Sequence, residues 1–184
     1  QILNAAQFGV PQDRRRLFLL GARDDVALPN YPDAMYLAPI AAKKNGHQAP
    51  TSLKPGPTVA DAFSDLPNVE WFEELMTSDC LILPAPLAEG SEYAARLHGS
   101  RSDPDDFSYK RASDPMLLTG CLRARHTELS RERFSQTIPG TTEPVSRFLR
   151  LPPDGLSNTL RAGTASDRGA FTAPRPIHPV YPRC

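Results

Sequence analysis

Three side chains near the start of the sequence combine types and spacing that suit the binding of anions. In the run from Gln7 to Ala22, Gln12, Arg14 and Arg16 alternate with other residues just before an apolar stretch. Successive side chains of a strand point to opposite faces, so these three would share one face at intervals of about 6.6 Å. Guanidinium groups cannot enter an apolar core unpaired. The pattern therefore predicts that they line a cleft and meet anions there; the alternative is an Arg cluster paired with a neighbouring helix.

An apolar run follows this polar group and predicts the element that positions it. Residues 13–22 include four consecutive apolar side chains, Leu17 to Leu20. Continuous apolarity of this length is typical of a strand covered on both faces, as in a parallel α/β sheet. Pro11 precedes the run, where a strand can begin without losing a ladder hydrogen bond. We therefore expect a buried strand at 13–22, followed by a long irregular connection over the Pro-rich residues 23–57.

The sequence predicts its clearest helix over residues 58–66. Thr58 and Asp61 form a capping box, in which each side chain accepts a hydrogen bond from the backbone amide of the other residue. Apolar side chains recur at helical spacing, and Pro67 ends the helix. The stripe consists of Val59, Ala62, Phe63 and Leu66. Its expected role is packing rather than chemistry.

Two further short helices are expected. One covers residues 91–97, with Gly99 as its C-terminal cap. The other covers residues 130–137 and stops before Pro139-Gly140. The residues beyond it consist of turns and short extended pieces, which is typical of a small β-rich domain.

Charge is distributed unevenly, although 21 basic and 21 acidic side chains bring the formal net charge to zero. Residues 1–57 carry a net +3, residues 58–118 a net −8 and residues 119–184 a net +5. All ten basic side chains after residue 111 are Arg, which suits bidentate contacts to phosphate and to base edges. Zero net charge therefore does not exclude a nucleic-acid partner. The alternative interpretation is that the charged segments are ordinary solvated surfaces.

Composition disfavours several classes of protein. The sequence has no run of 18 apolar residues and no signal-peptide pattern, so we expect no membrane span. Three Cys without a Cys-x-x-Cys pair, and four scattered His, predict neither a disulfide framework nor a metal site. These features favour an intracellular location, which would be the cytoplasm and its nucleoid if the source is a prokaryote.

The run from Gln7 to Ala22 closely resembles the Gln-x-Arg-x-Arg block, the eighth conserved block of DNA cytosine-5 methyltransferases. Residues 58–67 resemble the helix that often follows this block in bacterial members. Residues 157–164, Ser-Asn-Thr-Leu-Arg-Ala-Gly-Thr, resemble the Thr-Leu segment of the family's target-recognition domain. Residues 169–179 and Arg183-Cys184 resemble the approach to the ninth block. Because the sequence starts without Met and stops after a Pro-rich run, we expect a fragment of a longer enzyme.

The resemblance implies an α/β fold. It would comprise the last part of a doubly wound S-adenosylmethionine-dependent methyltransferase sheet, followed by a small, irregular, β-rich target-recognition domain. Residues 1–24 would hold the catalytic-domain strand. Residues 25–118 would form a connection with the helix at 58–66 and an acidic insertion facing away from the duplex, and residues 119–184 the target-recognition domain. The implied partner is double-stranded DNA, without membrane or metal, and the parent enzyme is expected to be a monomer.

Members of this family transfer a methyl group from S-adenosylmethionine to C5 of a cytosine that has been flipped out of duplex DNA. A thiolate adds at C6 because C5 is a poor nucleophile until that bond forms. By position, Arg16 is implied to reach the flipped cytosine near its O2 edge. Arg14 is implied to contact backbone phosphate and to position the catalytic loop, and Gln12 to support the geometry. A role in restriction–modification is an expectation at the level of the family.

The Thr-Leu segment implies a second set of DNA contacts. Thr159 and Leu160 correspond to the dipeptide that touches DNA near the flipped base. Arg161 and Gly163 would lie beside them on the recognition surface. The DNA sequence that is recognised does not follow from these residues, because base contacts depend on loop conformation.

The family's nucleophile and cofactor loop have no counterpart in this sequence. None of the three Cys follows a Pro, as the family's Pro-Cys pair requires, and we interpret Cys80 and Cys121 as ordinary small apolar residues. The Glu-Asn-Val triplet is absent, and the 11 Gly include no Gly-x-Gly. S-adenosylmethionine would therefore be bound by parts of the parent protein outside this sequence. We expect that this polypeptide alone transfers no methyl group.

Two other hypotheses remain open. The chain could be a non-catalytic DNA-binding module, or it could be an interaction protein whose Arg-rich ends pair with its own acidic middle. Phosphate contacts would make duplex binding steeply dependent on salt, whereas pairing within the chain would not.

Overall fold

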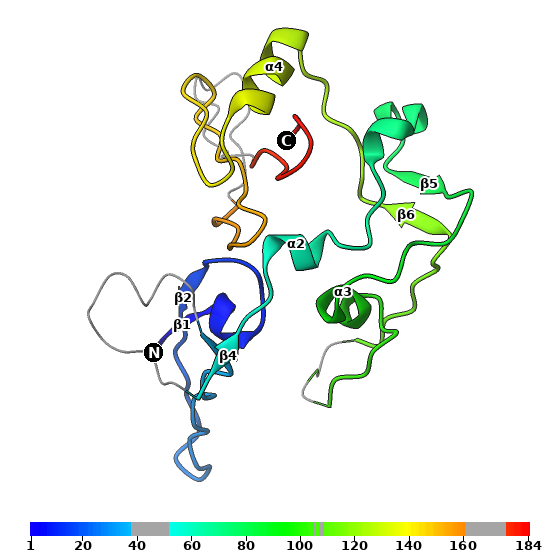
Figure 1. Cartoon of the computed structure of the whole chain (residues 1–184). Helices are drawn as coiled ribbons and strands as arrows, with labels where there is room; N and C mark the ends of the chain where they lie inside the picture. Colours follow the sequence, from blue (N-terminus) through cyan, green and yellow to red (C-terminus); the bar gives the residue numbers. More distant parts are fainter. Residues whose placement is uncertain (38–51, 105, 107–108, 161–175) are drawn as a thin grey trace.

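The computed structural model describes residues 1–37, 52–104, 106, 109–160 and 176–184. In Figure 1, an N-terminal part around β1 and β2 lies below, α2 lies at the centre, an acidic part carries α3, β5 and β6, and a C-terminal part carries α4. The described strands pair as β1 with β2, β3 with β4 and β5 with β6. In chain order the elements are β1 (Ile2–Asn4), η1 (Ala5–Phe8), β2 (Arg15–Leu17), β3 (Tyr36–Leu37), β4 (Lys54–Pro55), α2 (Val59–Ala62), η2 (Val69–Trp71), η3 (Glu73–Met76), β5 (Cys80–Ile82), α3 (Glu92–Leu97), β6 (Leu117–Thr119) and α4 (Glu128–Gln136).

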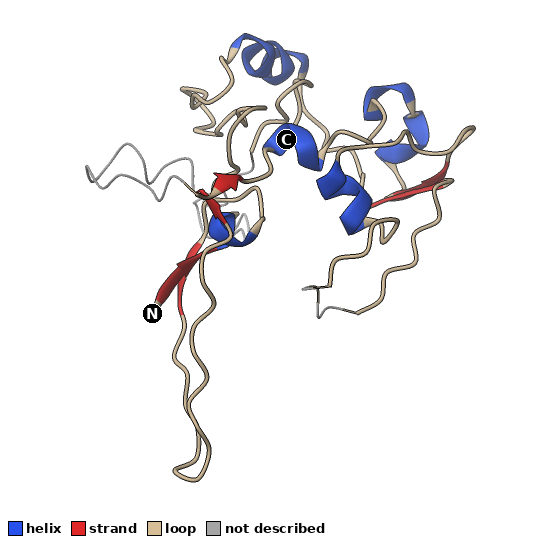
Figure 2. Ribbon diagram, turned by 60° about the horizontal axis from the view of Figure 1, so that its bottom comes forward, coloured by secondary structure: helices blue, strands red, loops and turns tan. Residues whose placement is uncertain are grey.

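The expected buried strand at 13–22 is wrong for the described residues. The structure has a three-residue strand, β2, which pairs antiparallel with β1 in the register Ile2 to Leu17. The apolar side chains Leu17 to Leu20 are exposed, up to 84% at Leu19. A two-stranded ribbon leaves both of its faces uncovered, and beyond β2 the chain projects away from the rest of the molecule before returning at β3 (Figure 2). The doubly wound sheet that would cover this run is not among the described elements.

The predicted capping box is confirmed, and the helix that it starts is shorter than expected. Thr58 caps α2 through the amide of Asp61, and the Asp61 carboxylate accepts from the Thr58 amide at 2.7 Å. The helix ends at Ala62 instead of Leu66. Pro67 explains part of this difference, because a residue that precedes proline is disfavoured in the helical conformation. The amides of Val59 and Ala60 donate to carbonyls of the turn at residues 153–155, so α2 is docked at its first turn.

The helices predicted over residues 91–97 and 130–137 are confirmed as α3 and α4, with small differences in their bounds. Ser91 caps α3, and Gly99 follows it with a positive φ of 74°. A Cβ at Gly99 would lie 2.9 Å from the Arg111 carbonyl oxygen, so glycine suits both the backbone and the space. Helix α4 begins at Glu128, two residues before the predicted start, because Thr127 serves as its cap.

The acidic middle builds a small core of its own. Leu75, Leu83 and Leu118 are almost fully buried against one another, and Leu118 comes from β6 of the β5–β6 ribbon. The C-terminal part is less regular than the expected β-rich domain. In its described residues beyond β6, backbone pairing is confined to isolated bridges, such as Thr142 with Leu149 and Arg150 with Ile177.

One carboxylate joins three segments that are remote in the sequence. Glu70, from η2, contacts Arg123, Arg131 and Arg183; its oxygen atoms lie 3.3 Å from Arg123 Nη2 and 3.1 Å from Arg131 Nη2. The side chains of Arg123 and Arg183 are 5% and 9% exposed. These four residues, called here the Glu70 cluster, connect the acidic middle to the arginines of the C-terminal part. The hypothesis that the Arg-rich ends pair with the acidic middle covered contacts of this kind, but it did not single out Glu70, since one Glu in an acidic stretch carries no distinguishing pattern.

The half-buried imidazole of His178 predicts a pH-dependent stability. Its Nδ1 accepts from the amides of Val180 and Tyr181, both at 3.1 Å, and burial together with the nearby Arg150 charge lowers its pKa from 6.5 to about 4. Between pH 6.5 and about 4 the unfolded chain therefore binds a proton that the folded chain does not, so stability should fall as pH falls through this window. Urea titrations of the wild type and of His178→Asn, which keeps an acceptor but does not titrate, should show a weaker dependence in the variant. Equal slopes would contradict the assignment.

No helix among the described residues is long and apolar enough to cross a membrane. In the same residues, no group of three or more His, Cys, Asp or Glu is arranged to hold a metal ion.

Candidate DNA-contacting site

Two of the segments singled out from the sequence meet in space although 146 residues separate them. Asp13 N donates to Ser157 O at 2.9 Å, and Ser157 N donates to Pro11 O at the same distance. The Gln12 side chain donates to Asn158 O at 3.2 Å, and the Thr159 hydroxyl donates to Asp13 O at 3.0 Å. Residues 11–13 and 157–159 form this contact, which we call the seam. It brings the Gln-x-Arg-x-Arg block beside the Thr-Leu segment.

Asn4 holds the block in place from the other side. Its side chain is buried, and Oδ1 accepts from the amides of Ala6 and Arg14 while Nδ2 donates to Asp13 Oδ1 at 2.8 Å. These bonds fix the backbone at Arg14 before β2 begins. The role of Asn4 was not predicted, because a lone Asn in an apolar stretch has no signature beyond its capping ability.

Arg14 and Arg16 keep their charges available. Arg14 is half-buried and Arg16 is exposed, and neither forms an ion pair with a carboxylate of the described residues. Arg16 donates to the carbonyl of Arg15, whose own guanidinium lies 3.9 Å from Asp13. The predicted alternative, an Arg cluster paired with a neighbouring helix, therefore does not describe Arg14 and Arg16.

The structure locates only part of the predicted recognition surface. Thr159 is bound into the seam, and Leu160 next to it is 50% exposed. Arg161 and Gly163 lie outside the described residues.

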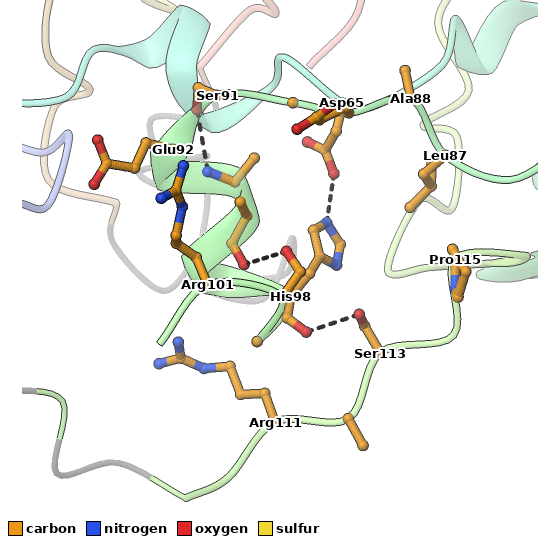
Figure 3. Close-up of a pocket in the computed structure, with 17 residues that line it drawn as sticks. Asp65, Leu87, Ala88, Ser91, Glu92, His98, Arg101, Arg111, Ser113 and Pro115 are labelled. Atoms are coloured by element: carbon orange, nitrogen blue, oxygen red, sulfur yellow. Dashed lines mark hydrogen bonds and ion pairs between the residues drawn. The ribbon is translucent and has the colours of Figure 1, made fainter. Parts of the chain in front are cut away.

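A cavity of about 800 Å³ lies elsewhere, between α3 and residues 111–115. In Figure 3, His98 is held between Asp65 and Ser113. His98 Nε2 lies 2.5 Å from Asp65 Oδ2, but the Ser113 hydroxyl donates to the His98 backbone carbonyl rather than to its ring. The described residues therefore form no nucleophile–base pair there, and none of the seam residues lines this cavity.

The three cysteines are free and differ in surroundings. Cys80 lies exposed on β5, which differs from the apolar role expected for it. Cys121 packs against the core of the acidic middle, and burial raises the pKa of its thiol. A raised pKa disfavours the thiolate that a nucleophile needs, so the expected structural role of Cys121 fits its surroundings.

Comparison with protein families decides the affiliation of the chain. The family model for C-5 cytosine-specific DNA methylases matches residues 1–104, which is more than half of the sequence. The chain belongs to the C-5 cytosine-specific DNA methylase family. The resemblance of the Gln-x-Arg-x-Arg block is thereby confirmed at the level of the family.

Relatives of this cytosine-5 methylase chain include bacterial and plant enzymes. It is 52% identical over 183 residues to the Type II methyltransferase M.XorII of Xanthomonas oryzae pv. oryzae, and it spans 38% of that protein's length. It is 25% identical over 192 residues to the DNA (cytosine-5)-methyltransferase CMT1 of Oryza sativa subsp. japonica, of which it spans 18%.

A solved structure supports the α/β methyltransferase fold. The chain matches over its whole length a protein described as a DNA modification methyltransferase encoded within a prophage of E. coli, with a TM-score of 0.52 and 20% identity. It covers 45% of that chain. At this identity the likeness concerns the fold alone.

Proposed function

We propose that this segment supplies the DNA-contacting surface of a cytosine-5 methyltransferase. The parent enzyme would transfer a methyl group from S-adenosylmethionine to C5 of a cytosine flipped out of the duplex. In this proposal Arg16 contacts the flipped base, Arg14 contacts backbone phosphate and Gln12 supports both. Thr159 and Leu160 touch the DNA near the flipped base, and Arg161 and Gly163 lie beside them.

The observation that carries this proposal is the seam together with the two available arginines. Hydrogen bonds across the seam place the Gln-x-Arg-x-Arg block and the Thr-Leu segment on neighbouring backbone. Arg14 and Arg16 lack an acid partner among the described residues, so their charge remains for an external anion. DNA phosphate is a suitable anion, because guanidinium groups bind it through paired hydrogen bonds. A surface built in this way would hold the duplex and the displaced base at once.

The residues present do not fit a binding site for S-adenosylmethionine. The sequence lacks a Gly-x-Gly loop, and the cavity beside α3 is lined by the paired Asp65 and His98 instead. The cofactor would supply the methyl group from a site formed by other parts of the parent protein. The contribution of this chain is to bind DNA and to orient the target base.

The proposal is tested by the salt dependence of duplex binding. We expect log K to fall steeply with log salt, at about 0.9 per phosphate neutralised. Arg14→Ala should make the slope shallower by about 0.9, since one phosphate contact is lost. Fluorescence anisotropy with a labelled duplex at several salt concentrations measures both slopes. A flat slope for the wild type would contradict the proposal and favour the pairing of the Arg-rich ends with the acidic middle.

A further inference from the structure

Arg147 has an unusual backbone conformation. Among the described residues that are not glycine, it alone has a positive φ, at 61°. This left-handed region is disfavoured for side chains that carry a Cβ. Arg147 is also exposed, and its guanidinium forms no ion pair or hydrogen bond with another described residue. Strain of this kind persists where the surrounding structure imposes it, and it concentrates at functional positions.

The turn that carries Arg147 is held rigidly. Glu143 is 1% exposed, and its Oε2 accepts from both the amide and the hydroxyl of Ser146 at 2.5 Å. Its other oxygen lies 3.3 Å from Arg133 Nε. Backbone hydrogen bonds from Arg147 to Glu143 and from Glu143 to Phe148 close the turn. Residues 143–148, called here the Glu143 turn, are thus fixed by a buried carboxylate while their tip faces solvent.

The Glu143 turn is connected to the candidate DNA surface by paired backbone. Leu151 N donates to Ile177 O at 3.0 Å, and Ile177 N donates to Leu149 O at 2.8 Å. The chain then passes the turn at residues 153–155 and enters the seam at Ser157. In Figure 1 this stretch, coloured yellow to orange, descends from beside α4 toward the N-terminal part. The turn and the seam therefore belong to one connected C-terminal unit.

We propose that the Glu143 turn reads DNA sequence, and that the Arg147 guanidinium binds the O6 and N7 acceptors of a guanine in the major groove. The inference rests on the proposed function. A phosphate contact needs charge but little direction, whereas a bidentate contact to guanine needs the planar fork held in one orientation. The rigid turn fixes the backbone from which the Arg147 side chain projects, so fewer conformations separate the free from the bound fork. Val145, 67% exposed on the same turn, offers an apolar surface to a neighbouring base.

The test compares base preference with overall affinity. The 184-residue chain is incubated with a pool of duplexes randomised over a short window, and the bound fraction is sequenced. We expect a preference for guanine at one position of roughly tenfold to a hundredfold. Arg147→Lys keeps the charge but loses the fork, and it should lower this preference about tenfold without changing the others. Arg147→Gly should abolish it while retaining the fold, because glycine suits the left-handed backbone.

Arg125 provides the matched control. It is an exposed arginine of the same C-terminal part with an ordinary backbone, so Arg125→Lys and Arg125→Gly should leave base preference unchanged. Uniform weakening by Arg147→Gly, with a salt slope shallower by about 0.9, would overturn the inference and indicate a phosphate contact. A wild type that binds duplex with a steep salt slope but no base preference would also overturn it. If duplex binding by the wild type did not depend on salt, that result would instead contradict the proposed function itself.

Discussion

Replacing Arg16 with Ala is expected to lower methyl transfer by on the order of a hundredfold while duplex binding falls only a few-fold. The reason is that its proposed partner is the flipped base, which is present only at the moment of catalysis. The effect can be measured in a chimaera in which this chain replaces the matching segment of M.XorII. Transfer of tritiated methyl groups and duplex affinity are determined on the same preparation.

Arg15→Ala is the control for this experiment. Arg15 neighbours Arg16 on β2, but alternation places it on the opposite face of the strand, with its guanidinium toward Asp13. Its removal should leave methyl transfer nearly unchanged. If Arg16→Ala retained full turnover, or if both variants lost transfer and binding equally, the assignment of Arg16 to the base would be wrong.

Glu70→Gln is expected to destabilise the chain by about 3 kcal/mol, which corresponds to a fall in melting temperature of about 10 °C. The substitution leaves Arg123 and Arg183 largely buried without their shared counter-charge. Three guanidinium groups would then repel one another where the acidic middle meets the C-terminal part. Thermal and urea unfolding followed by circular dichroism measure the loss.

Glu73→Gln separates this local effect from a general change of charge. Glu73 also faces Arg123, at 3.8 Å, but its side chain is 89% exposed. An exposed ion pair contributes little, so Glu73→Gln should change stability by less than about 0.5 kcal/mol. Equal losses of stability in the two variants would show that the Glu70 cluster does not hold the acidic middle against the C-terminal part.

The local elements that depend on neighbouring residues could be predicted from the sequence. Thr58 and Asp61 form their capping box, and Ser91 and Gly99 bound α3, because capping depends on the identity of residues one turn apart. The predicted strand at 13–22 was wrong in length and burial for a different reason. An apolar run indicates that its side chains must be buried by other residues, but not whether those residues belong to the same chain. In the described residues, the β1–β2 ribbon leaves Leu17 to Leu20 exposed.

The candidate site was predicted less completely than the helices. The type and spacing of Gln12, Arg14 and Arg16 pointed to an anion site, and the family resemblance added Thr159. The contacts that build the site were not predictable, because the seam joins residues 146 positions apart and a lone Asn4 gives no sign that it binds Asp13 and Arg14. The hypothesis that the Arg-rich ends pair with the acidic middle describes the Glu70 cluster. It does not describe Arg14 and Arg16.

The seam also has a consequence for synthesis of the protein. Asp13 leaves the ribosome long before Thr159, its partner at 146 residues' separation. At about 5–20 residues per second, the ribosome needs roughly 7 to 30 seconds to supply that partner. Closing so long a loop costs about 4 kcal/mol in chain entropy, which the contacts of the folded chain must offset. The seam can therefore form only after residues 157–159 have been made, late in the synthesis of this segment.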